Sequence, residues 1–355
     1  MDQSPLRIAQ LSPLFEAVPP KLYGGTERVV SWLTEALVHR GHHVVLFASG
    51  DSQTSAELVP VVDRAIRLAR GGDPIVSHTT MLGMVQQRAH EFDVIHSHLD
   101  TFALPAFGPQ HPPAVTTMHG RLDLPWLEPA FRVFADRPLV SISYSQRRPV
   151  EWARWVACIH HGLPIENYPV GEGRGDYVLF LGRMSPEKRP HAAIALARRA
   201  GIRIVLAAKV DEADKRYFEE VVEPMLDAPG VEYVGEADQQ QKLRLLGDAR
   251  ALLFPMFWPE PFGLVMIEAL ACGTPVITTS CGAAPEVVAD GHVGFVCDGD
   301  EQLQRALGRI DEIDRRACRA WAEERFTSDR AAREYEAVYR TLIAERHRRV
   351  RSASA

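Results

Sequence analysis

Short apolar runs alternate with amphipathic helical patterns along almost the whole chain. The first series of runs predicts strands at residues 6–11, 44–48, 94–96, 115–118 and 139–143. A second series predicts strands at residues 177–181, 204–208, 231–234, 251–254, 276–278 and 294–297. A helix is expected to begin near Thr26, because apolar residues recur on one helical face up to Leu37, and Gly41 is well placed to end it. Apolar strands alternating with helices predict an α/β protein whose parallel sheets are covered on both faces.

The two series of strands are separated by residues 161–174, where glycines and prolines interrupt regular structure. The length of 355 residues suits two α/β domains of about 150–200 residues each. We therefore predict an N-terminal domain over residues 1–167 and a second domain over residues 168–320. Open parallel sheets bind ligands beyond the carboxyl ends of their strands, so the expected site is a cleft between the two domains.

The end of the chain is predicted to be purely helical from about Asp314 onward. Residues 321–355 are expected to form a C-terminal helix and a tail. The helix has an apolar face made of Tyr335, Val338, Tyr339 and Leu342. The tail after Glu345 is basic, with Arg346, His347, Arg348, Arg349 and Arg351, and is predicted to be disordered and solvated. Weak peripheral contact with anionic lipid is the alternative.

The composition argues against a nucleic-acid partner and against disulfide bonds. The net charge of −6 provides no global positive field to attract nucleic acid. The five cysteines are scattered without a C-x-x-C pair, so buried thiols in a reducing compartment are expected, with neither a disulfide framework nor a zinc knuckle. Neither a signal-peptide core nor an apolar run of about 18 residues is evident. We therefore expect a soluble cytoplasmic protein with no nucleic-acid partner.

The first candidate site is the loop over residues 12–25, which ends in Gly24-Gly25-Thr26 at a predicted helix start. Long loops between a strand and a helix are often functional. Bare glycines let backbone N–H groups approach an oxyanion, and the helix N-terminus adds positive potential. The alternative interpretation is a flexible loop with Thr26 as the N-cap. The motif lacks the G-x-G-x-x-G pattern, which makes NAD an unlikely ligand.

The second candidate site is GRMSPEK, which follows the first strand of the second series. Arg183 and Lys188 lie five residues apart at the carboxyl end of this strand. An arginine can bind a diphosphate bidentately and a lysine acts as a point charge. Taken alone, this segment is equally consistent with a solvated loop.

The third candidate site, WPEPFGLVMIEAL, is the most specific. Glu260 lies in a proline-rich turn and Glu268 inside the helix that follows, where eight residues would span about 12 Å. This distance suits one carboxylate near a sugar and the other near a ribose. The helix start offers the backbone N–H groups of Phe262, Gly263 and Leu264. The alternative interpretation makes Glu260 a helix-start charge and Glu268 a surface residue.

A fourth candidate is His119-Gly120, directly after the strand predicted at residues 115–118. A histidine beside a glycine at a strand end is placed to reach into a cleft. The alternative is that His119 merely caps the strand.

The motifs GGTERVV, His119-Gly120, LGRMSPEK and EPFGLVMIEALACGTPVI together resemble those of retaining glycosyltransferases of family 4, which have the GT-B fold. The resemblance covers nearly the whole chain and is nearest to the subgroup that contains an avilamycin-pathway glycosyltransferase. It implies two Rossmann-like parallel-sheet domains facing across a cleft, with the C-terminal helix crossing back to the N-terminal domain. The implied reaction moves a sugar from a nucleoside diphosphate to an acceptor and needs no metal.

The resemblance also implies residue roles at the donor diphosphate and sugar. Backbone N–H groups at Gly24 and Gly25 would face the diphosphate, together with Arg183 and Lys188. Glu260 would accept hydroxyls of the donor sugar. The N–H groups of Phe262, Gly263 and Leu264 would hold sugar and phosphate oxygens.

At the other parts of the donor, the resemblance implies that Glu268 binds the ribose and that His119 contacts the donor near its reacting end. The base would lie near Gly235-Glu236, after the strand at residues 231–234. No motif fixes the base, and UDP- and GDP-sugars both remain candidates. The acceptor (a glycan, a lipid-linked sugar or a small molecule) is equally open.

Three other patterns suggest chemistry but have simpler interpretations. Asp298-Gly299-Asp300 has the spacing of a manganese site but is expected to form a loop and cap a helix. His96 and His98 share a strand face without an evident third metal ligand. An acceptor or lipid surface could involve Trp126, Trp152 and Trp155 beside Arg147 and Arg148, although ordinary packing is favoured.

Two rival functions fit the same fold. One is another enzyme, such as a non-hydrolysing sugar-nucleotide epimerase or a phosphorylase, although the third motif fits transfer better. The other is a catalytically silent subunit that binds a nucleotide sugar. Such a subunit could lose Glu260 or His119, and the sequence has both. A donor-hydrolysis assay would discriminate between them.

Overall fold

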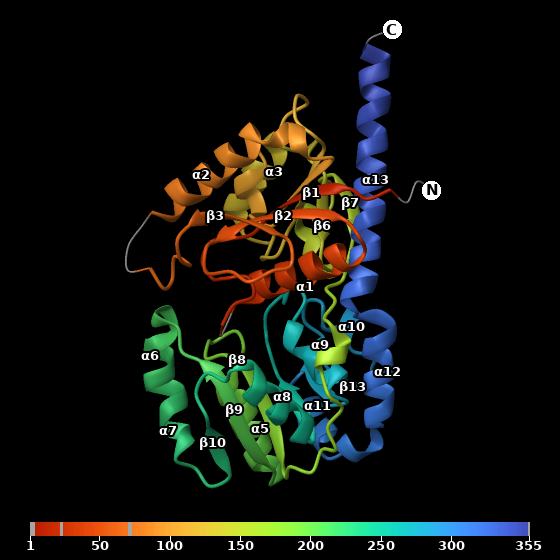
Figure 1. The fold of residues 1–355 in the computed structure, drawn as a ribbon. Coiled ribbons are helices and arrows are strands. Elements are labelled where there is room, and N and C mark those ends of the chain that lie inside the picture. Colours follow the sequence, from red (N-terminus) through yellow and green to blue (C-terminus); the bar gives the residue numbers. More distant parts are fainter. Residues whose placement is uncertain (1–3, 22–23, 70–72, 354–355) are drawn as a thin grey trace. The chain divides into compact units, whose positions relative to one another are not determined.

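The computed structural model describes residues 4–21, 24–69 and 73–353, which form two compact units (Figure 1). The first unit contains the chain up to Gly162 and the segment from Ser328 onward, and the second unit is Leu163–Thr327. The division between Gly162 and Leu163 falls inside the predicted seam at residues 161–174. Each unit has a parallel sheet with helices, so the predicted α/β fold class is confirmed.

The first unit is built on a seven-stranded parallel sheet in the order β3-β2-β1-β4-β5-β6-β7. Its strands are β1 (Arg7–Leu11), β2 (His43–Ser49), β3 (Glu57–Val62), β4 (Val94–Ser97), β5 (Ala114–Thr117), β6 (Leu139–Ser141) and β7 (Trp155–Cys158). The predicted strands correspond to β1, β2, β4, β5 and β6, whereas β3 and β7 were not predicted. Both lie at the edges of the sheet and are mostly half-buried. Pro60 interrupts the apolar run of β3, whereas the four apolar residues of β7 were not recognised as a strand.

The helices of the first unit include α1, which begins near the predicted start at Thr26. They are α1 (Gly25–His39), α2 (Pro74–Gln87), η1 (Ala89–Glu91), η2 (Asp100–Ala103), η3 (Pro125–Leu127), α3 (Glu128–Val133), α4 (Tyr144–Arg147), η4 (Arg148–Val150) and α13 (Ser328–Ala353). Gly41, two residues beyond the end of α1, has a φ of +89°, a conformation that favours glycine.

The predicted disorder after Glu345 is wrong, because α13 continues to Ala353. The segment contains no proline or glycine and is rich in arginine, a good helix former, so basic composition alone was a poor guide. The last turns of this helix are exposed. None of the helices in the described residues has both the length and the apolar character that a membrane span requires.

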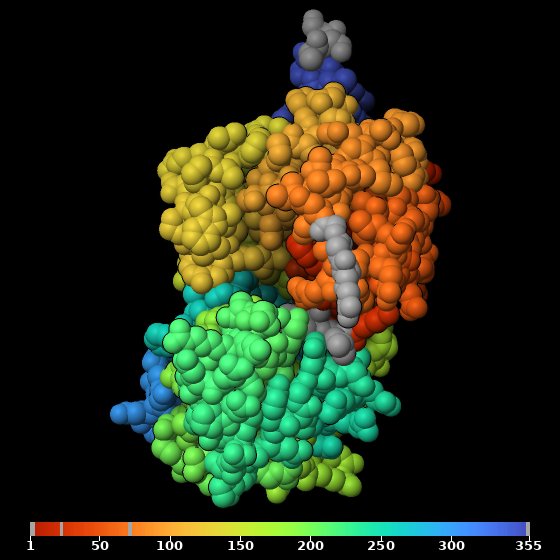
Figure 2. Space-filling view, turned by 90° about the vertical axis from the view of Figure 1, so that its left-hand side faces the viewer, coloured from red at the N-terminus to blue at the C-terminus, as the bar shows by residue number. Residues whose placement is uncertain are grey.

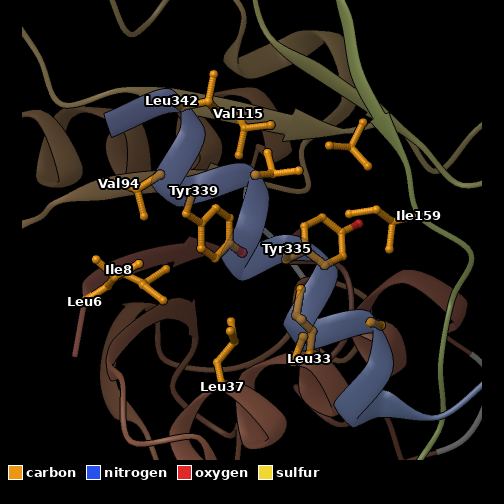
Figure 3. Packing of buried hydrophobic residues seen from close by; sticks show 14 of the residues in the cluster. Leu6, Ile8, Leu33, Leu37, Val94, Val115, Ile159, Tyr335, Tyr339 and Leu342 are labelled. Atoms are coloured by element: carbon orange, nitrogen blue, oxygen red, sulfur yellow. The ribbon is translucent and has the colours of Figure 1, made fainter. Parts of the chain in front are cut away.

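The apolar face of α13 packs into the core of the first unit (Figure 3). Tyr335 and Tyr339 point from the helix toward side chains of the sheet and of α1. The cluster contains Leu6, Ile8, Leu33, Leu37, Val44, Val94, Val115, Val140, Ile159, Ala331, Ala332, Tyr335, Val338, Tyr339 and Leu342. Both tyrosine hydroxyls are also hydrogen-bonded, Tyr335 to Thr117 at 2.9 Å and Tyr339 to His96 at 2.7 Å. The last helix is therefore part of the first unit's core.

Part of the first unit's surface is apolar as well. The η3–α3 segment (gold in Figure 2) carries Trp126, which is 71% exposed. Trp152 is 46% exposed, with the Arg132 guanidinium 4.9 Å from its ring centroid. Trp155 instead packs against a core cluster and donates its indole N–H to the Val150 carbonyl at 2.9 Å. Packing is thus the role of Trp155 but not of Trp126.

The second unit is built on a six-stranded parallel sheet in the order β10-β9-β8-β11-β12-β13. Its strands are β8 (Tyr177–Arg183), β9 (Arg203–Lys209), β10 (Val231–Tyr233), β11 (Ala251–Phe254), β12 (Val276–Thr279) and β13 (Gly294–Cys297). All six were predicted, because most of these strands are buried on both faces and read as apolar runs.

Helices cover this second sheet. They are α5 (Pro190–Ala200), η6 (Glu212–Asp214), α6 (Lys215–Tyr217), the π-helical η7 (Phe218–Val222), α7 (Glu223–Leu226), α8 (Gln239–Asp248), α9 (Leu264–Ala271), α10 (Ala284–Val287), α11 (Asp300–Leu307), η8 (Ile310–Glu312) and α12 (Arg315–Arg325). A further 3-10 turn, η5 (Ile165–Asn167), precedes β8. In a parallel sheet the carboxyl ends of all strands lie along one side, which is called the carboxyl edge of the sheet below. The predicted donor-binding residues of this unit lie at or after those strand ends.

Candidate active site

In the second unit, the loops after the neighbouring strands β8 and β11 hold the main charged residues. Arg183 ends β8, and Lys188 lies in the loop between this strand and α5. Glu260 lies in the loop between β11 and α9. The two loops are joined by a hydrogen bond of 3.0 Å from the Phe257 N–H to the Glu187 carbonyl. The sheet order therefore brings together two motifs that are about seventy residues apart in the sequence.

Lys188 and Glu260 form an ion pair between the Lys188 Nζ and the Glu260 Oε2. Each residue is only 9% exposed. The Trp258 indole N–H donates to the same carboxylate oxygen at 2.6 Å, and the Lys188 Nζ lies 4.6 Å from the Trp258 ring centroid. A pair removed from water in this way is costly to form unless it is hydrogen-bonded. Both charges are thus held in fixed positions, next to the start of α9.

Two glycines fix the backbone around Glu260. A Cβ added to Gly282 would lie 2.2 Å from the Glu260 nitrogen, and the Gly282 φ of +61° also favours glycine. The Ala283 N–H donates to the Glu260 carbonyl at 2.9 Å. Gly263 is the N-cap of α9 with a φ of +85°. The local sequence therefore positions both the carboxylate and the N-terminal turn of α9.

Glu268 is buried within α9, with 3% of its surface exposed, so the interpretation of this glutamate as a surface residue is wrong. Its carboxylate forms an ion pair with Lys242 of α8. The Tyr168 hydroxyl donates to the Glu268 Oε1 at 3.0 Å. The carboxylate is thus held by a cation and a hydroxyl, an arrangement able to accept further hydroxyl donors.

Arg183 is more exposed than Lys188 and is surrounded by carboxylates. Its guanidinium forms an ion pair with Glu187 and lies 3.2 Å from Asp214 and 3.8 Å from Asp211. Burial raises the pKa of Asp214. The positive charge of Arg183 is therefore largely balanced until an anionic ligand competes with these carboxylates.

Gly235 and Glu236 follow β10 at the same carboxyl edge of the second sheet. The Gly235 carbonyl accepts the Ala208 N–H at 2.8 Å, and the Gly235 φ is +74°. This residue thus ties its loop to the neighbouring strand β9 in a conformation that suits glycine.

In the first unit, Gly24 is the N-cap of α1 and Gly25 its first residue. The predicted alternative with Thr26 as the N-cap is wrong, because Thr26 lies within the first turn. A Cβ on Gly24 would lie 2.7 Å from the Pro20 Cβ, so the close approach of the loop requires a glycine. Leu22 and Tyr23, within the predicted site loop, lie outside the described residues. Burial raises the pKa of Glu27, in the first turn of α1, to about 7.

His119 follows β5 and is partly buried beside two buried imidazoles, those of His98 and His161. The His119 Nε2 lies 2.8 Å from the His98 Nδ1, and its ring stacks on that of His161 with centroids 5.4 Å apart. The His119 N–H donates to the Asp100 Oδ1 at 2.8 Å. Burial lowers the pKa of His119 to about 3, so the ring is neutral near pH 7. His119 is therefore oriented through both its backbone and its ring.

The predicted face shared by His96 and His98 is confirmed, because their ring centroids lie 4.1 Å apart. The partners of these histidines are protein groups. The His96 nitrogens lie 2.7 Å from the Tyr339 hydroxyl and 2.8 Å from the Thr117 hydroxyl. The pair thus forms part of a hydrogen-bond network in the first unit.

The D-x-D pattern also has structural partners. Asp298 accepts a hydrogen bond from the Ser280 hydroxyl at 2.7 Å. Asp300 begins α11 and forms an ion pair with Arg189 at 3.0 Å. These contacts agree with the predicted loop, but the predicted helix cap is wrong, because the N-cap of α11 is Gly299 and no side chain caps this helix.

Several residues that contact the candidate site were not singled out from the sequence. Lys242 and Tyr168 hold Glu268, and Gln10, His98 and Asp100 belong to the surroundings of His119. They come from elements that are distant in sequence and carry no local motif. Of these residues, only His98 belonged to a sequence pattern, the pair of histidines on one strand face, and that pattern suggested a metal site.

Two protein-family models match the chain. The model described as Glycosyltransferase Family 4 matches residues 23–161, and the model described as Glycosyl transferases group 1 matches residues 170–324. Glycogen synthase of Mycobacterium tuberculosis is 27% identical, with 88% of each chain covered. D-inositol 3-phosphate glycosyltransferase of Streptomyces avermitilis is also 27% identical, with 78% of this chain and 71% of that protein covered.

Solved structures have the same fold. AviGT4, a glycosyltransferase involved in avilamycin A biosynthesis, aligns with a TM-score of 0.71 at 24% identity, over 96% of this chain and 98% of that chain. The Anabaena protein HepE, in complex with UDP and glucose, aligns with a TM-score of 0.71 at 18% identity, over 94% and 99%.

The fold and the two family matches define a glycosyltransferase of the GT-B type. The chain belongs to these enzymes, with an N-terminal part of the Glycosyltransferase Family 4 type followed by a group 1 part. The resemblance of the sequence motifs to those of GT-B glycosyltransferases is thereby confirmed.

Proposed function

We propose that this protein transfers a sugar from a UDP- or GDP-sugar to an acceptor hydroxyl with retention of the anomeric configuration. The acceptor is a glycan, a lipid-linked sugar or a small molecule. The observation that carries the proposal is the buried Lys188–Glu260 pair beside the N-terminus of α9. This ion pair places a cation that can bind phosphate directly beside a carboxylate that can accept sugar hydroxyls. HepE, which shares the fold, has been solved in complex with UDP and with UDP-glucose, which supports a nucleotide-sugar donor.

Fixed cations would stabilise the leaving diphosphate. Lys188 is held in place by Glu260 and by the Trp258 ring, so little reorganisation is needed when negative charge develops. Arg183 would exchange one or more of its carboxylate partners for phosphate oxygens, which accept its planar fork of N–H donors well. These two side chains would do the work that a divalent metal does in other transferases, so we propose a metal-independent reaction.

The carboxylates and backbone amides would hold the rest of the donor. Glu260 would accept two hydroxyls of the sugar, while the N–H groups of Phe262, Gly263 and Leu264 bind sugar and phosphate oxygens with the help of the helix dipole. Glu268, held by Lys242 and Tyr168, would accept the ribose hydroxyls. Gly235 and Glu236 would lie beside the base.

The first unit would contribute groups without net charge. Backbone N–H groups at Gly24 and Gly25 start α1 and would face the diphosphate. His119 would contact the donor near its reacting end as a neutral imidazole. Its low pKa keeps it uncharged at neutral pH, which suits hydrogen bonding to a hydroxyl.

Retention is proposed to proceed by attack on the face from which the diphosphate leaves. The acceptor oxygen forms a bond to the anomeric carbon as the bond to the phosphate oxygen breaks, and that phosphate oxygen takes the acceptor proton. Lys188, Arg183 and the Gly24-Gly25 amides would stabilise the phosphate throughout. Glu260 would serve sugar hydroxyls and form no covalent intermediate.

A thermal-shift panel tests donor binding most simply. A ligand at 100 times its dissociation constant stabilises the folded protein by about 2.7 kcal/mol. We expect one group among UDP-, GDP- and ADP-sugars to raise Tm strongly, and the Glu268→Ala variant to lose most of that shift. Stabilisation by none of the nucleotide sugars would contradict the proposal. A donor-hydrolysis assay on the same samples separates an active enzyme from a silent binding subunit.

A further inference from the structure

A chain of hydrogen bonds runs from the interior of the first unit to His119. The Gln10 Oε1 lies 2.8 Å from the His98 Nε2, and the His98 Nδ1 lies 2.8 Å from the His119 Nε2. Gln10 is 0% exposed and His98 is 1% exposed. The chain is therefore shielded from water up to His119 itself, which is only partly buried.

The chemistry of these groups fixes where the protons lie. An amide oxygen can only accept, so the His98 Nε2 carries a proton and donates it to Gln10. Burial holds the pKa of His98 well below its usual range, so this ring is neutral and its Nδ1 can only accept. The His119 Nε2 must then carry a proton and donate it. Because His119 is neutral as well, its Nδ1 is left as a hydrogen-bond acceptor.

Neighbouring groups hold both rings in this arrangement. The His96 ring lies against His98 with centroids 4.1 Å apart, and His96 is itself fixed by the hydroxyls of Thr117 and Tyr339. The His161 ring stacks on His119 at an interplanar angle of 15°. Rotation of either imidazole would break these contacts, so the direction of the hydrogen bonds is a property of the packed network.

We propose that His98 is a positioning residue that fixes His119 as the tautomer with an unprotonated Nδ1, so that His119 accepts a hydrogen bond from a hydroxyl of the donor sugar. The use of this acceptor rests on the proposed function, whereas the tautomer itself does not. A hydroxyl is recognised as a donor at this point. A sugar that lacks that hydroxyl, or carries an O-methyl group there, therefore binds and reacts less well.

The tautomer is measured directly by nitrogen-15 NMR of histidine-labelled protein at pH 7. We expect the His119 Nδ1 to show the chemical shift of an unprotonated imidazole nitrogen and the Nε2 that of a protonated one. The reverse assignment, or rapid exchange between the two forms, would overturn the proposal. This readout needs neither donor nor acceptor, so it stands apart from a failure of the proposed transferase activity.

Two substitutions separate positioning from packing. In the His98→Asn variant the amide oxygen can take the place of the Nδ1 acceptor, whereas His98→Leu leaves the His119 Nε2 without a partner. We expect His98→Leu to lower kcat by roughly 10-fold or more, as for other groups that orient a functional histidine, and His98→Asn to recover much of that loss. The binding of free UDP or GDP, which lacks the sugar, should be similar in both variants. Equal activity in the two variants would overturn the proposal.

His42→Asn is the matched control for stability. His42 is another buried histidine of this unit, and its Nδ1 accepts the Leu6 N–H at 3.1 Å. His42 precedes β2 and so lies where the strands begin, whereas His98 follows β4 and lies where the strands end. The two histidines are therefore at opposite ends of the strands of the parallel sheet. We expect this variant to change Tm without changing the nitrogen-15 shifts of His119. If His98→Leu fails to fold, the measurement on the unsubstituted protein and on His98→Asn still decides.

Discussion

The second unit presents charged, paired side chains at the carboxyl edge of its sheet, whereas the first unit presents neutral, hydrogen-bonded side chains at the corresponding edge. Lys188 and Lys242 each hold a glutamate, while the first unit gathers His98, His119 and His161. Burial has different consequences for the two sets. A buried lysine and glutamate can stay charged by pairing, but a buried histidine without a carboxylate partner loses its proton. Charged side chains suit a leaving diphosphate, and neutral side chains suit sugar hydroxyls. The difference therefore agrees with the proposal that the second unit binds the diphosphate and that the first unit contacts the sugar.

Removing a cation from the second unit should have the largest effect. Lys188→Ala and Arg183→Ala should each lower kcat/KM by roughly 10²-fold or more, on the scale of a lost charge contact to the transition state. Steady-state kinetics with the donor found in the thermal-shift panel measures this. Lys215→Ala is the control, because that lysine is 57% exposed and pairs loosely with Glu219 at 3.9 Å. Near-normal kinetics in a folded Lys188→Ala protein would place the diphosphate elsewhere.

The two glutamates of the second unit should fail in different ways. Glu268→Ala removes a ribose contact made in ground and transition states alike, so KM should rise by about 10-fold or more with a smaller fall in kcat. Glu260 is proposed to contact the reacting sugar, so Glu260→Ala should chiefly lower kcat. The matching Gln variants control for a buried lysine left without its partner. If both glutamates gave the same defect confined to KM, Glu260 would be a distant binding residue.

Acid should destabilise the first unit before the second. Burial lowers the pKa of His96 and His119 to about 3, and holds those of His98 and His161 well below the usual range. The unfolded chain binds these protons near pH 6.5, so the unfolded state becomes more favoured as the pH falls below about 6.5. His96 and His119 each lower the free energy of unfolding by about 1.4 kcal/mol per pH unit between about pH 6.5 and 3.

Two carboxyl groups of the first unit, Glu27 and Asp100, act in the opposite direction, because burial raises the pKa of both. Burial raises the pKa of Glu27 to about 7, so the folded state holds a proton that the unfolded state loses above about pH 4.5. Two such carboxyls do not offset four histidines. Hydrogen exchange resolved along the chain at pH 7 and pH 5 should show the larger loss of protection in the sheet of the first unit. An earlier loss in the second unit would contradict the comparison.

The smallest effect is expected from chelation. Because Lys188 and Arg183 are proposed to carry the charge stabilisation, EDTA should leave kcat/KM essentially unchanged. The assay is repeated with manganese added back, which should also change little. Full inhibition by EDTA that manganese reverses would show that these side chains are not sufficient.

The fold was predictable wherever the strand is buried on both faces. The predicted strands at residues 251–254 and 294–297 match β11 and β13 at both ends, because continuous apolar runs report full burial. The edge strands β3 and β7 are half-exposed; Pro60 interrupts the apolar run of β3, whereas the four apolar residues of β7 were not recognised as a strand. The apolar face around Tyr335 and Tyr339 was equally visible, but its packing partners are non-local and came only through resemblance.

The candidate site was predictable only where its chemistry is local. Glu260 and Glu268 share one motif with the helix start, so spacing placed them correctly in a turn and within a helix. Lys242 and Tyr168 approach Glu268 from other elements, and no pattern in the sequence reports such a contact. The same holds for Gln10 on β1 and His98 directly after β4, which come together only because these two strands pair.

The central claim is transfer with retention, and proton NMR during turnover tests it most directly. An α-linked UDP- or GDP-sugar is followed with water or an identified sugar as acceptor, and the first-formed product is assigned before free sugar can interconvert. The account predicts that the α product appears first, with no trapped glycosyl-enzyme. A β product appearing first would contradict retention and require a general base near the acceptor hydroxyl.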